Sequence, residues 1–133
     1  MQDRPDAGNL LEAIQDFLMK EVMPAVKSND LLSYKTLVSW NMLGVISREI
    51  KLGEVYLNEE LKRLKEYLTS DVIIKPEDDY YSKMEVCKEL NSRLVEKIRE
   101  KKLTNKDKEV WNLVKQGLKE KLEISNPRFQ SGE

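Results

Sequence analysis

Two asparagines, Asn41 and Asn91, stand where the helical spacing of their neighbours predicts an apolar face. Asn41 lies four residues after Leu37 and four before Val45, and Asn91 follows Cys87 by four residues. An amide that is buried without a partner costs about 1–3 kcal/mol, so each of these side chains needs a hydrogen bond. We expect the two amides either to pair in a structural contact or to share a polar pocket that contacts a ligand.

Arg48 and Glu49 follow Asn41 on the same expected helix. Arg48 comes seven residues after Asn41, so the two side chains project from nearly the same side. A guanidinium can bind a carboxylate or phosphate through two parallel hydrogen bonds, and it can equally form an ion pair within the fold. In the first case Arg48 would mark an anion site, with Glu49 as its one candidate base.

Charged residues beside a proline occur at both ends of the chain. Asp3 and Arg4 precede Pro5, and Arg128 follows Pro127. Such segments either tie the termini down by capping helix ends or contribute to a binding site. The candidate ligand-binding residues are therefore Asp3, Arg4, Asn41, Arg48, Glu49, Asn91 and Arg128.

The composition excludes several kinds of chemistry. The chain contains no histidine, which rules out histidine acid–base catalysis, Ser–His or Cys–His nucleophile pairs and histidine metal ligands. The single cysteine, Cys87, cannot form an internal disulfide or a thiolate metal cluster, and a lone core thiol fits a reducing compartment. We therefore expect neither a metal nor a cofactor, and no residue is assigned a catalytic role.

The bulk properties are those of one globular domain covering residues 1–133. Hydrophobic residues make up 40% and charged residues 35% of the sequence, and the net charge is −1. Nucleic-acid-binding domains usually carry a basic excess, so no nucleic-acid partner is expected. No signal peptide opens the sequence, and no apolar run reaches the roughly 20 residues that span a bilayer. The sequence thus predicts a cytoplasmic protein that does not enter a membrane.

Apolar residues recur at helical spacing in five segments: residues 6–23, 31–51, 54–68, 80–101 and 105–124. Short connections and a loop at residues 69–79 favour antiparallel neighbours, so we predict an all-α, up-down bundle of about five helices. Residues 37–46 are apolar nearly all round, which predicts a central, buried second helix, and Gly44 would let a neighbour approach closely. The second helix is expected to end before Gly53. In the last segment, the expected core face is Val110, Trp111, Val114, Leu118 and Leu122.

Several short motifs occur in order along the chain. They are Gln2-Asp3-Arg4-Pro5, Glu21-Val22-Met23-Pro24, Asn41 with Arg48-Glu49, Glu89-Leu90-Asn91, and Asn126-Pro127-Arg128. This set resembles a small uncharacterised family of bacterial helical domains. Members are found beside or fused to aminoglycoside-phosphotransferase-like kinases, and some lie beside acyl-CoA dehydrogenase-like genes. The resemblance implies an accessory role with such a partner, and it carries no established activity.

Three functions stay open. The leading interpretation is a non-catalytic accessory or protein-interaction domain that serves a small-molecule kinase-like partner. The second is a pocket for an anionic small molecule, with or without catalysis, lined by Arg48, Arg128, Asn41 and Glu49. The third is a structural homo-oligomer, such as a homodimer, formed through the apolar surface around residues 40–43.

Overall fold

The computed structural model describes residues 3–129, and these residues form helices and connecting loops without any strand, which confirms the all-α prediction. The elements are α1 (Ala7–Phe17), a π-helical turn η1 (Leu18–Val22), α2 (Met23–Ala25), α3 (Asp30–Leu68), α4 (Tyr80–Glu100) and α5 (Lys108–Ser125).

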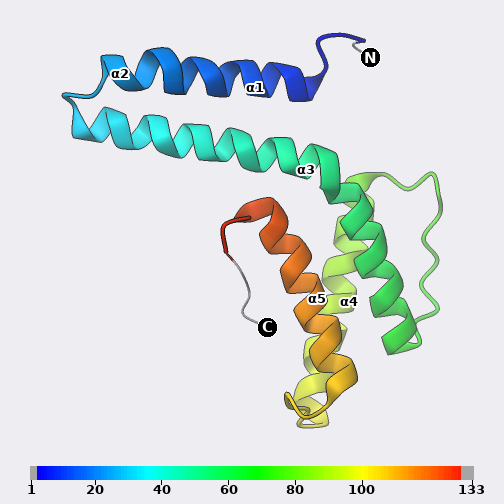
Figure 1. The fold of residues 1–133 in the computed structure, drawn as a ribbon. Coiled ribbons are helices and arrows are strands. Elements are labelled where there is room, and N and C mark those ends of the chain that lie inside the picture. Colours follow the sequence, from blue (N-terminus) through cyan, green and yellow to red (C-terminus); the bar gives the residue numbers. More distant parts are fainter. Residues whose placement is uncertain (1–2, 130–133) are drawn as a thin grey trace.

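The helices form two structural parts that share α3 (Figure 1). α1, η1 and α2 run antiparallel to the first part of α3, and we call residues 7–50 the hairpin. The rest of α3 turns away from this direction and packs against α4 and α5, and we call residues 51–125 the bundle.

α4 runs parallel to this part of α3, because Tyr80 contacts Glu49 and Asn91 contacts Glu60, and the loop 69–79 returns along the bundle between them (Figure 1). Only α5 is antiparallel to α3 in the bundle, so the predicted up-down arrangement was wrong for this pair of helices.

α3 is one continuous helix of 39 residues, so the predicted break before Gly53 was wrong. The second and third expected helices are both parts of α3. Because α1, η1 and α2 follow one another without a break, residues 3–129 contain four helical segments rather than the five expected. Gly53 is buried within the helix, and a Cβ at this position would lie 2.7 Å from Oε1 of Glu49 and 3.0 Å from the hydroxyl of Tyr80. The glycine therefore serves the close approach of α4 to α3 rather than a helix end.

Side-chain caps fix where the helices begin. Asn29 accepts a hydrogen bond from the backbone N–H of Leu32 at 3.0 Å, and Asp79 accepts one from that of Ser82 at 2.7 Å. Such caps satisfy backbone donors in the first turn, which have no partner inside the helix. At the other end of α3, Thr69 adopts a left-handed conformation with φ of 48° and stops the helix.

The hydrophobic core lies in the bundle. Its members recur at helical spacing on three helices, which explains why these helices pack along their length. Two residues of the loop, Val72 and Ile74, cover the side of the core. The core consists of Leu57, Leu61 and Leu64 from α3, Cys87, Leu90 and Leu94 from α4, and Val110 from α5.

The hairpin lacks such a core, so the prediction of a central, buried second helix was wrong for its first half. α1, η1 and α2 cover most of this part of α3, because α4 and α5 pack against the later part and reach only Arg48 and Glu49 of the hairpin. α1 does approach α3 closely at Gly44, where the Nε2 of Gln15 donates to the carbonyl of Trp40 at 3.1 Å. Large apolar side chains stay exposed on both helices: Leu10, Ile14, Phe17, Leu31, Leu32, Tyr34, Leu37, Met42, Ile46 and Ile50.

Candidate functional site

A cavity of about 570 Å³ lies between α3, α4 and α5, in the part of the bundle nearest the hairpin. This volume is within the range of pockets that bind small molecules. Apolar side chains such as Leu57, Met84 and Ile124 form part of its wall. Its polar and ionisable lining residues are Glu49, Tyr56, Glu60, Tyr80, Lys88, Asn91, Ser92, Glu120 and Lys121.

Glu60 connects the three helices that surround the cavity. Its Oε1 accepts hydrogen bonds from Nδ2 of Asn91 at 3.1 Å and from Nζ of Lys121 at 2.6 Å, so it joins all three helices of the bundle. Burial by itself would raise the pKa of Glu60, but the hydrogen bonds from Lys121 and Asn91 outweigh it and lower the pKa below 4.5. Glu60 is therefore a carboxylate at neutral pH.

The thiol of Cys87 lies close to the Glu60 carboxylate but is unreactive at neutral pH. Nδ2 of Asn91 lies 3.1 Å from the carbonyl oxygen and 3.5 Å from the sulfur of Cys87. Burial, together with the nearby charge of Glu60, raises the pKa of the Cys87 thiol to about 12. The thiolate is the nucleophilic form, so this cysteine packs as a small core residue and is not a nucleophile at neutral pH.

Tyr80 and Glu49 close the end of the cavity toward the hairpin. The Tyr80 hydroxyl donates to Oε1 of Glu49, directly above buried Gly53. Burial, and then the hydrogen bond to Glu49, raise the pKa of Tyr80 to about 12, so the phenol stays protonated. This contact links the first turn of α4 to the middle of α3.

Glu120 holds α5 against α3 through a buried ion pair. Nη1 and Nη2 of Arg63 donate to its two carboxylate oxygens at 3.0 and 2.5 Å, a bidentate geometry that fixes both side chains. Nε2 of Gln116 donates to the same carboxylate at 2.9 Å. The Glu120 side chain is 9% exposed and the Arg63 side chain 24%, so the carboxylate is shielded from solvent while the guanidinium is partly exposed.

The lining of the cavity favours a cation or a hydroxyl donor over an anion. Glu60 is paired with Lys121 and Glu120 with Arg63, whereas Glu49 accepts only from the Tyr80 hydroxyl and forms no ion pair within residues 3–129. A cationic amine with an apolar body would pair with Glu49 and contact the apolar wall.

The structure brings only part of the predicted site together. Glu49 and Asn91 both line the cavity. Asn41 is exposed on the hairpin rather than buried, and Asn91 pairs with Glu60 instead, so the expected Asn41–Asn91 contact was wrong. The expectation failed because the part of α3 that carries Asn41 has no helix packed on that side.

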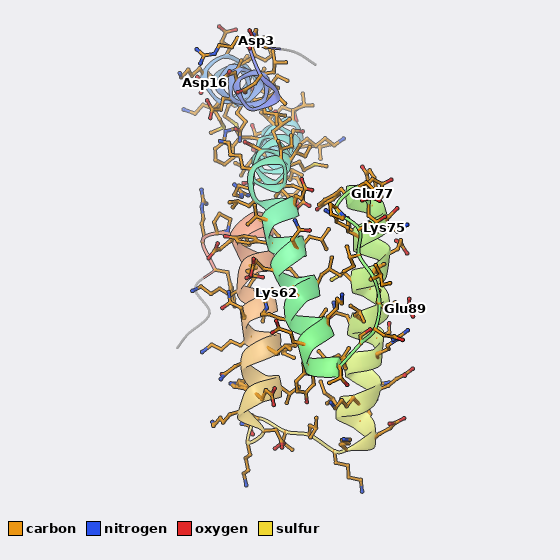
Figure 2. All side chains as sticks on the ribbon, turned by 90° about the vertical axis from the view of Figure 1, so that its right-hand side faces the viewer. Asp3, Asp16, Lys62, Lys75, Glu77 and Glu89 are labelled. Atoms are coloured by element: carbon orange, nitrogen blue, oxygen red, sulfur yellow. The ribbon has the colours of Figure 1, made fainter. Side chains whose placement is uncertain are left out.

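The charged residues of the predicted site lie at separate places. The Nε of Arg48 donates to the carbonyl of Ile124 at 2.7 Å, close to the end of α5, which satisfies a carbonyl left free by the helix terminus. Arg128 is exposed after α5 and does not line the cavity. Asp3 and Arg4 are exposed before α1, and Figure 2 shows Asp3 on the side of the hairpin away from the bundle.

Sequence reasoning missed Glu60 and Glu120 because a glutamate on a helix is usually exposed to solvent. On α5, the buried residues are Val110, Gly117 and Glu120, whereas most of the expected core face is exposed. The available signal was the spacing of Gly117 and Glu120 with Val110, which marks a second face of the helix. A buried glutamate on that face required a cationic partner, and Arg63 supplies it.

Within residues 3–129, no group of three or more cysteine and carboxylate side chains is placed to hold a metal ion. In the same part of the chain, no helix combines the length and apolarity needed to cross a membrane.

These features define an all-helical domain in which a three-helix bundle with a largely apolar cavity carries a projecting hairpin. The chain belongs to a family described as a domain of unknown function (DUF6285), whose model matches residues 24–129. The match begins at Pro24, so it includes all of α3, α4 and α5 and leaves α1 outside. No curated protein matches the chain, and no solved structure does.

Proposed function

We propose that this chain is a non-catalytic accessory domain that binds another protein through its hairpin. The observation that carries this proposal is the exposure of the hairpin's large apolar side chains. Leu10, Ile14 and Phe17 form a stripe at spacing i, i+4, i+7 on α1, and all three are exposed. Isolated domains rarely expose a contiguous apolar surface of this kind unless it binds a partner.

The contrast between the hairpin and the bundle supports the same interpretation. The bundle buries Leu61, Leu64 and Leu90 almost completely, whereas the hairpin buries no large apolar side chain among its described residues. Burial of apolar surface contributes about 25 cal/mol per Å², so covering the hairpin would stabilise it substantially. The bundle thus acts as the stable base from which the hairpin is presented.

The partner we propose is the small-molecule kinase-like protein that the family resemblance suggests, with an acyl-CoA dehydrogenase-like protein as the alternative. A cytoplasmic setting is part of this proposal. The bundle would then hold the hairpin in position, and its polar network would be structural.

Binding by calorimetry between this chain and the phosphotransferase-like kinase encoded nearest to it tests the proposal. Ile14→Glu should abolish binding because it places a charge in the α1 stripe. Val95→Glu is the matched control, since Val95 is also exposed but lies on α4 in the bundle. Val95→Glu should bind like the wild type.

A second measurement does not depend on guessing the partner. Met19 and Met42 are exposed in the hairpin and can be oxidised with peroxide, both in cells and in dilute purified protein. If the hairpin binds a partner, at least one of the two methionines should be protected in cells, because they lie on different sides of the hairpin. Equal oxidation in both settings, together with no binding to the kinase, would overturn the proposal.

A second candidate function is small-molecule binding in the cavity of the bundle. Its volume and its mixed apolar and carboxylate lining favour this function independently of the hairpin. We propose an amine as the ligand in preference to the anion that the sequence suggested. Thermal-shift measurements should show stabilisation by alkylamines but not by phosphate, carboxylates or acyl-CoA. Stabilisation that Glu49→Gln fails to reduce would count against binding at this cavity.

A further inference from the structure

α4 and α5 leave a gap between them along the bundle. Both helices pack against α3, and within residues 3–129 they make no close backbone contact with each other. Figure 2 shows them standing on either side of α3. The gap therefore has α3 as its floor and the facing sides of α4 and α5 as its walls.

A second cavity, of about 210 Å³, lies in this gap. It shares Glu60, Asn91 and Lys121 with the larger cavity, and it continues from them in the direction away from Glu49. Most of its other lining residues are apolar and come from all three helices. We call them the α4–α5 groove: Leu64, Leu94, Leu113, Val114 and Leu118.

α5 turns an exposed apolar stripe toward this groove. Trp111, Val114 and Leu118 follow one another at spacing i, i+3, i+7, and they are 46%, 42% and 52% exposed. Val114 and Leu118 also line the groove. Side chains at this spacing form one face of a helix, and such a face packs against a second helix.

The charges of α5 are sorted around the same stripe. At 100° per residue, its lysines Lys108, Lys115 and Lys121 lie within about 80° of Leu118. Its glutamates Glu109, Glu120 and Glu123 lie at least about 140° away from Leu118. Arg63 and Tyr56 bind Glu120 and Glu123 on that other side.

α4 shows the same separation of charge. Lys88 and Arg99 lie within about 80° of Asn91, which lines the groove side of the helix. All four glutamates of α4 lie at least about 120° away from Asn91: Glu85, Glu89, Glu96 and Glu100. Both edges of the groove are therefore basic.

Several of these cations are available to a partner. Arg99, Lys108 and Lys115 form no ion pair within residues 3–129. Lys88 pairs only with the exposed Glu85 on its own helix, and an exposed pair of this kind contributes little.

We propose that the α4–α5 groove binds an amphipathic helix of another protein, with its apolar stripe against Leu118 and acidic residues along both edges of that stripe. The apolar floor matches the stripe, and the basic edges match the acidic flanks. A second copy of this chain fits less well, because two α5 helices packed through their stripes would bring lysines together.

The length of the groove suits such a helix. Trp111 and Lys121 are ten residues apart, which corresponds to about 15 Å, or three helical turns of a partner. The groove lies in the bundle, so this proposal is independent of binding at the hairpin.

Tryptophan fluorescence tests the proposal with two synthetic peptides. Trp40→Phe leaves Trp111 as the single tryptophan, beside the groove. The peptides are about 18 residues long, which is enough to form a helix, with leucine at i, i+3, i+4 and i+7. One carries glutamate and the other lysine at the flanking positions. The glutamate peptide should shift the emission of Trp111 to the blue, and the lysine peptide should not.

Substitutions in the same background locate the contact. Leu118→Glu and Lys115→Glu should each raise the dissociation constant of the glutamate peptide by about tenfold or more. Both residues are exposed in the free chain, so the emission of the free variants should match that of the parent. Lys115→Glu should also improve binding of the lysine peptide.

Lys62→Glu is the matched control for the charge reversal. Lys62 is exposed on α3 and stands about 160° around that helix from Glu60, so it lies away from the groove. This variant should bind the glutamate peptide like the parent. Ile14→Glu, which should abolish binding at the hairpin, should leave the affinity for the peptide unchanged as well.

Three outcomes would overturn the proposal. The first is no shift with the glutamate peptide at concentrations up to about 200 µM. The second is an equal response to the two peptides. The third is a shift with laurate and none with the glutamate peptide, which would mean that the groove takes an acyl chain. Each result is obtained without the kinase, so it leaves the hairpin's proposed function untouched.

Discussion

The amide of Asn91 and the carboxylate of Glu60 meet at 3.1 Å, across the contact between α4 and α3. Lys121 reaches the same carboxylate oxygen from α5 at 2.6 Å. One side chain thus receives hydrogen bonds from the two other helices of the bundle. The packing of α3, α4 and α5 around Glu60 therefore depends on the negative charge of its carboxylate.

Glu60→Gln should lower the free energy of unfolding at neutral pH. It should also make that free energy less dependent on pH in the acid range. Since the pKa of Glu60 in the folded chain is lowered below 4.5, its contribution is fully present above about pH 4.5. That contribution disappears as the pH falls through the pKa of Glu60 in the folded chain. We expect a loss of about 1–2 kcal/mol at pH 7 that shrinks below pH 4.5, measured by urea unfolding across pH.

The matched control for this prediction is Glu59→Gln, because Glu59 is the exposed neighbour of Glu60. Its unfolding free energy should stay within about 0.5 kcal/mol of the wild type at each pH. A pH profile of Glu60→Gln that runs parallel to the wild type would show that the carboxylate is not held as described.

Glu120→Gln should be more costly, because it leaves the guanidinium of Arg63 without its bidentate partner in a shielded place. We expect a loss of about 2–4 kcal/mol at pH 7 by urea unfolding. Glu96→Gln, on the exposed side of α4, should change stability by less than about 0.5 kcal/mol. If Glu120→Gln loses no more unfolding free energy than Glu96→Gln, the Arg63–Glu120 pair makes no net contribution to stability.

Leu90→Ala tests where the core lies. Leu90 is completely buried at the centre of the bundle, so its truncation should cost about 2–5 kcal/mol through lost burial and a residual cavity. Val95→Ala changes an exposed apolar residue on the same helix and should cost less than about 1 kcal/mol. Thermal unfolding of the two variants checks the difference, and equal losses would contradict the core described here.

Gly53→Ala should separate Tyr80 from Glu49. The added Cβ would lie 2.7 Å from Oε1 of Glu49, so that flexible side chain must rotate away. The pKa of Tyr80 should then fall from about 12, although burial keeps it above 10. Tyrosinate absorbance, compared with Tyr80→Phe, measures the change. Stability should shift by no more than about 1 kcal/mol, because alanine favours the helix.

Much of the bundle could be predicted from the sequence, since Leu57, Leu61 and Leu64 repeat at the spacing of one buried helical face. The continuity of α3 could not, because Gly53 is a common helix-end signal and only the closeness of Tyr80 shows its packing role. Asn41 was misplaced for a different reason. An apolar pattern indicates what could be buried, and it does not show whether another helix is present to bury it.

The candidate site could be predicted only where a polar residue stands at a position whose helical spacing predicts a buried apolar one. Asn91 follows Cys87 by one helical turn, and the structure places it on the cavity. Glu60 and Glu120 carry no such mark, because a glutamate on a helix is usually solvated and its burial depends on cations from other helices. Arg63 and Lys121, which supply those cations, lie 57 and 61 residues away from the glutamates they bind.

The uninterrupted course of α3 also sets a rule for how this architecture can vary. One residue inserted near the boundary of hairpin and bundle would rotate the hairpin by about 100° around the helix axis and advance it by about 1.5 Å. The exposed apolar side chains of the hairpin would then point to a different side of the bundle, although the contacts within each part would survive. An insertion in the loop at residues 69–79 would leave the direction of the hairpin unchanged, because that loop does not connect the two parts.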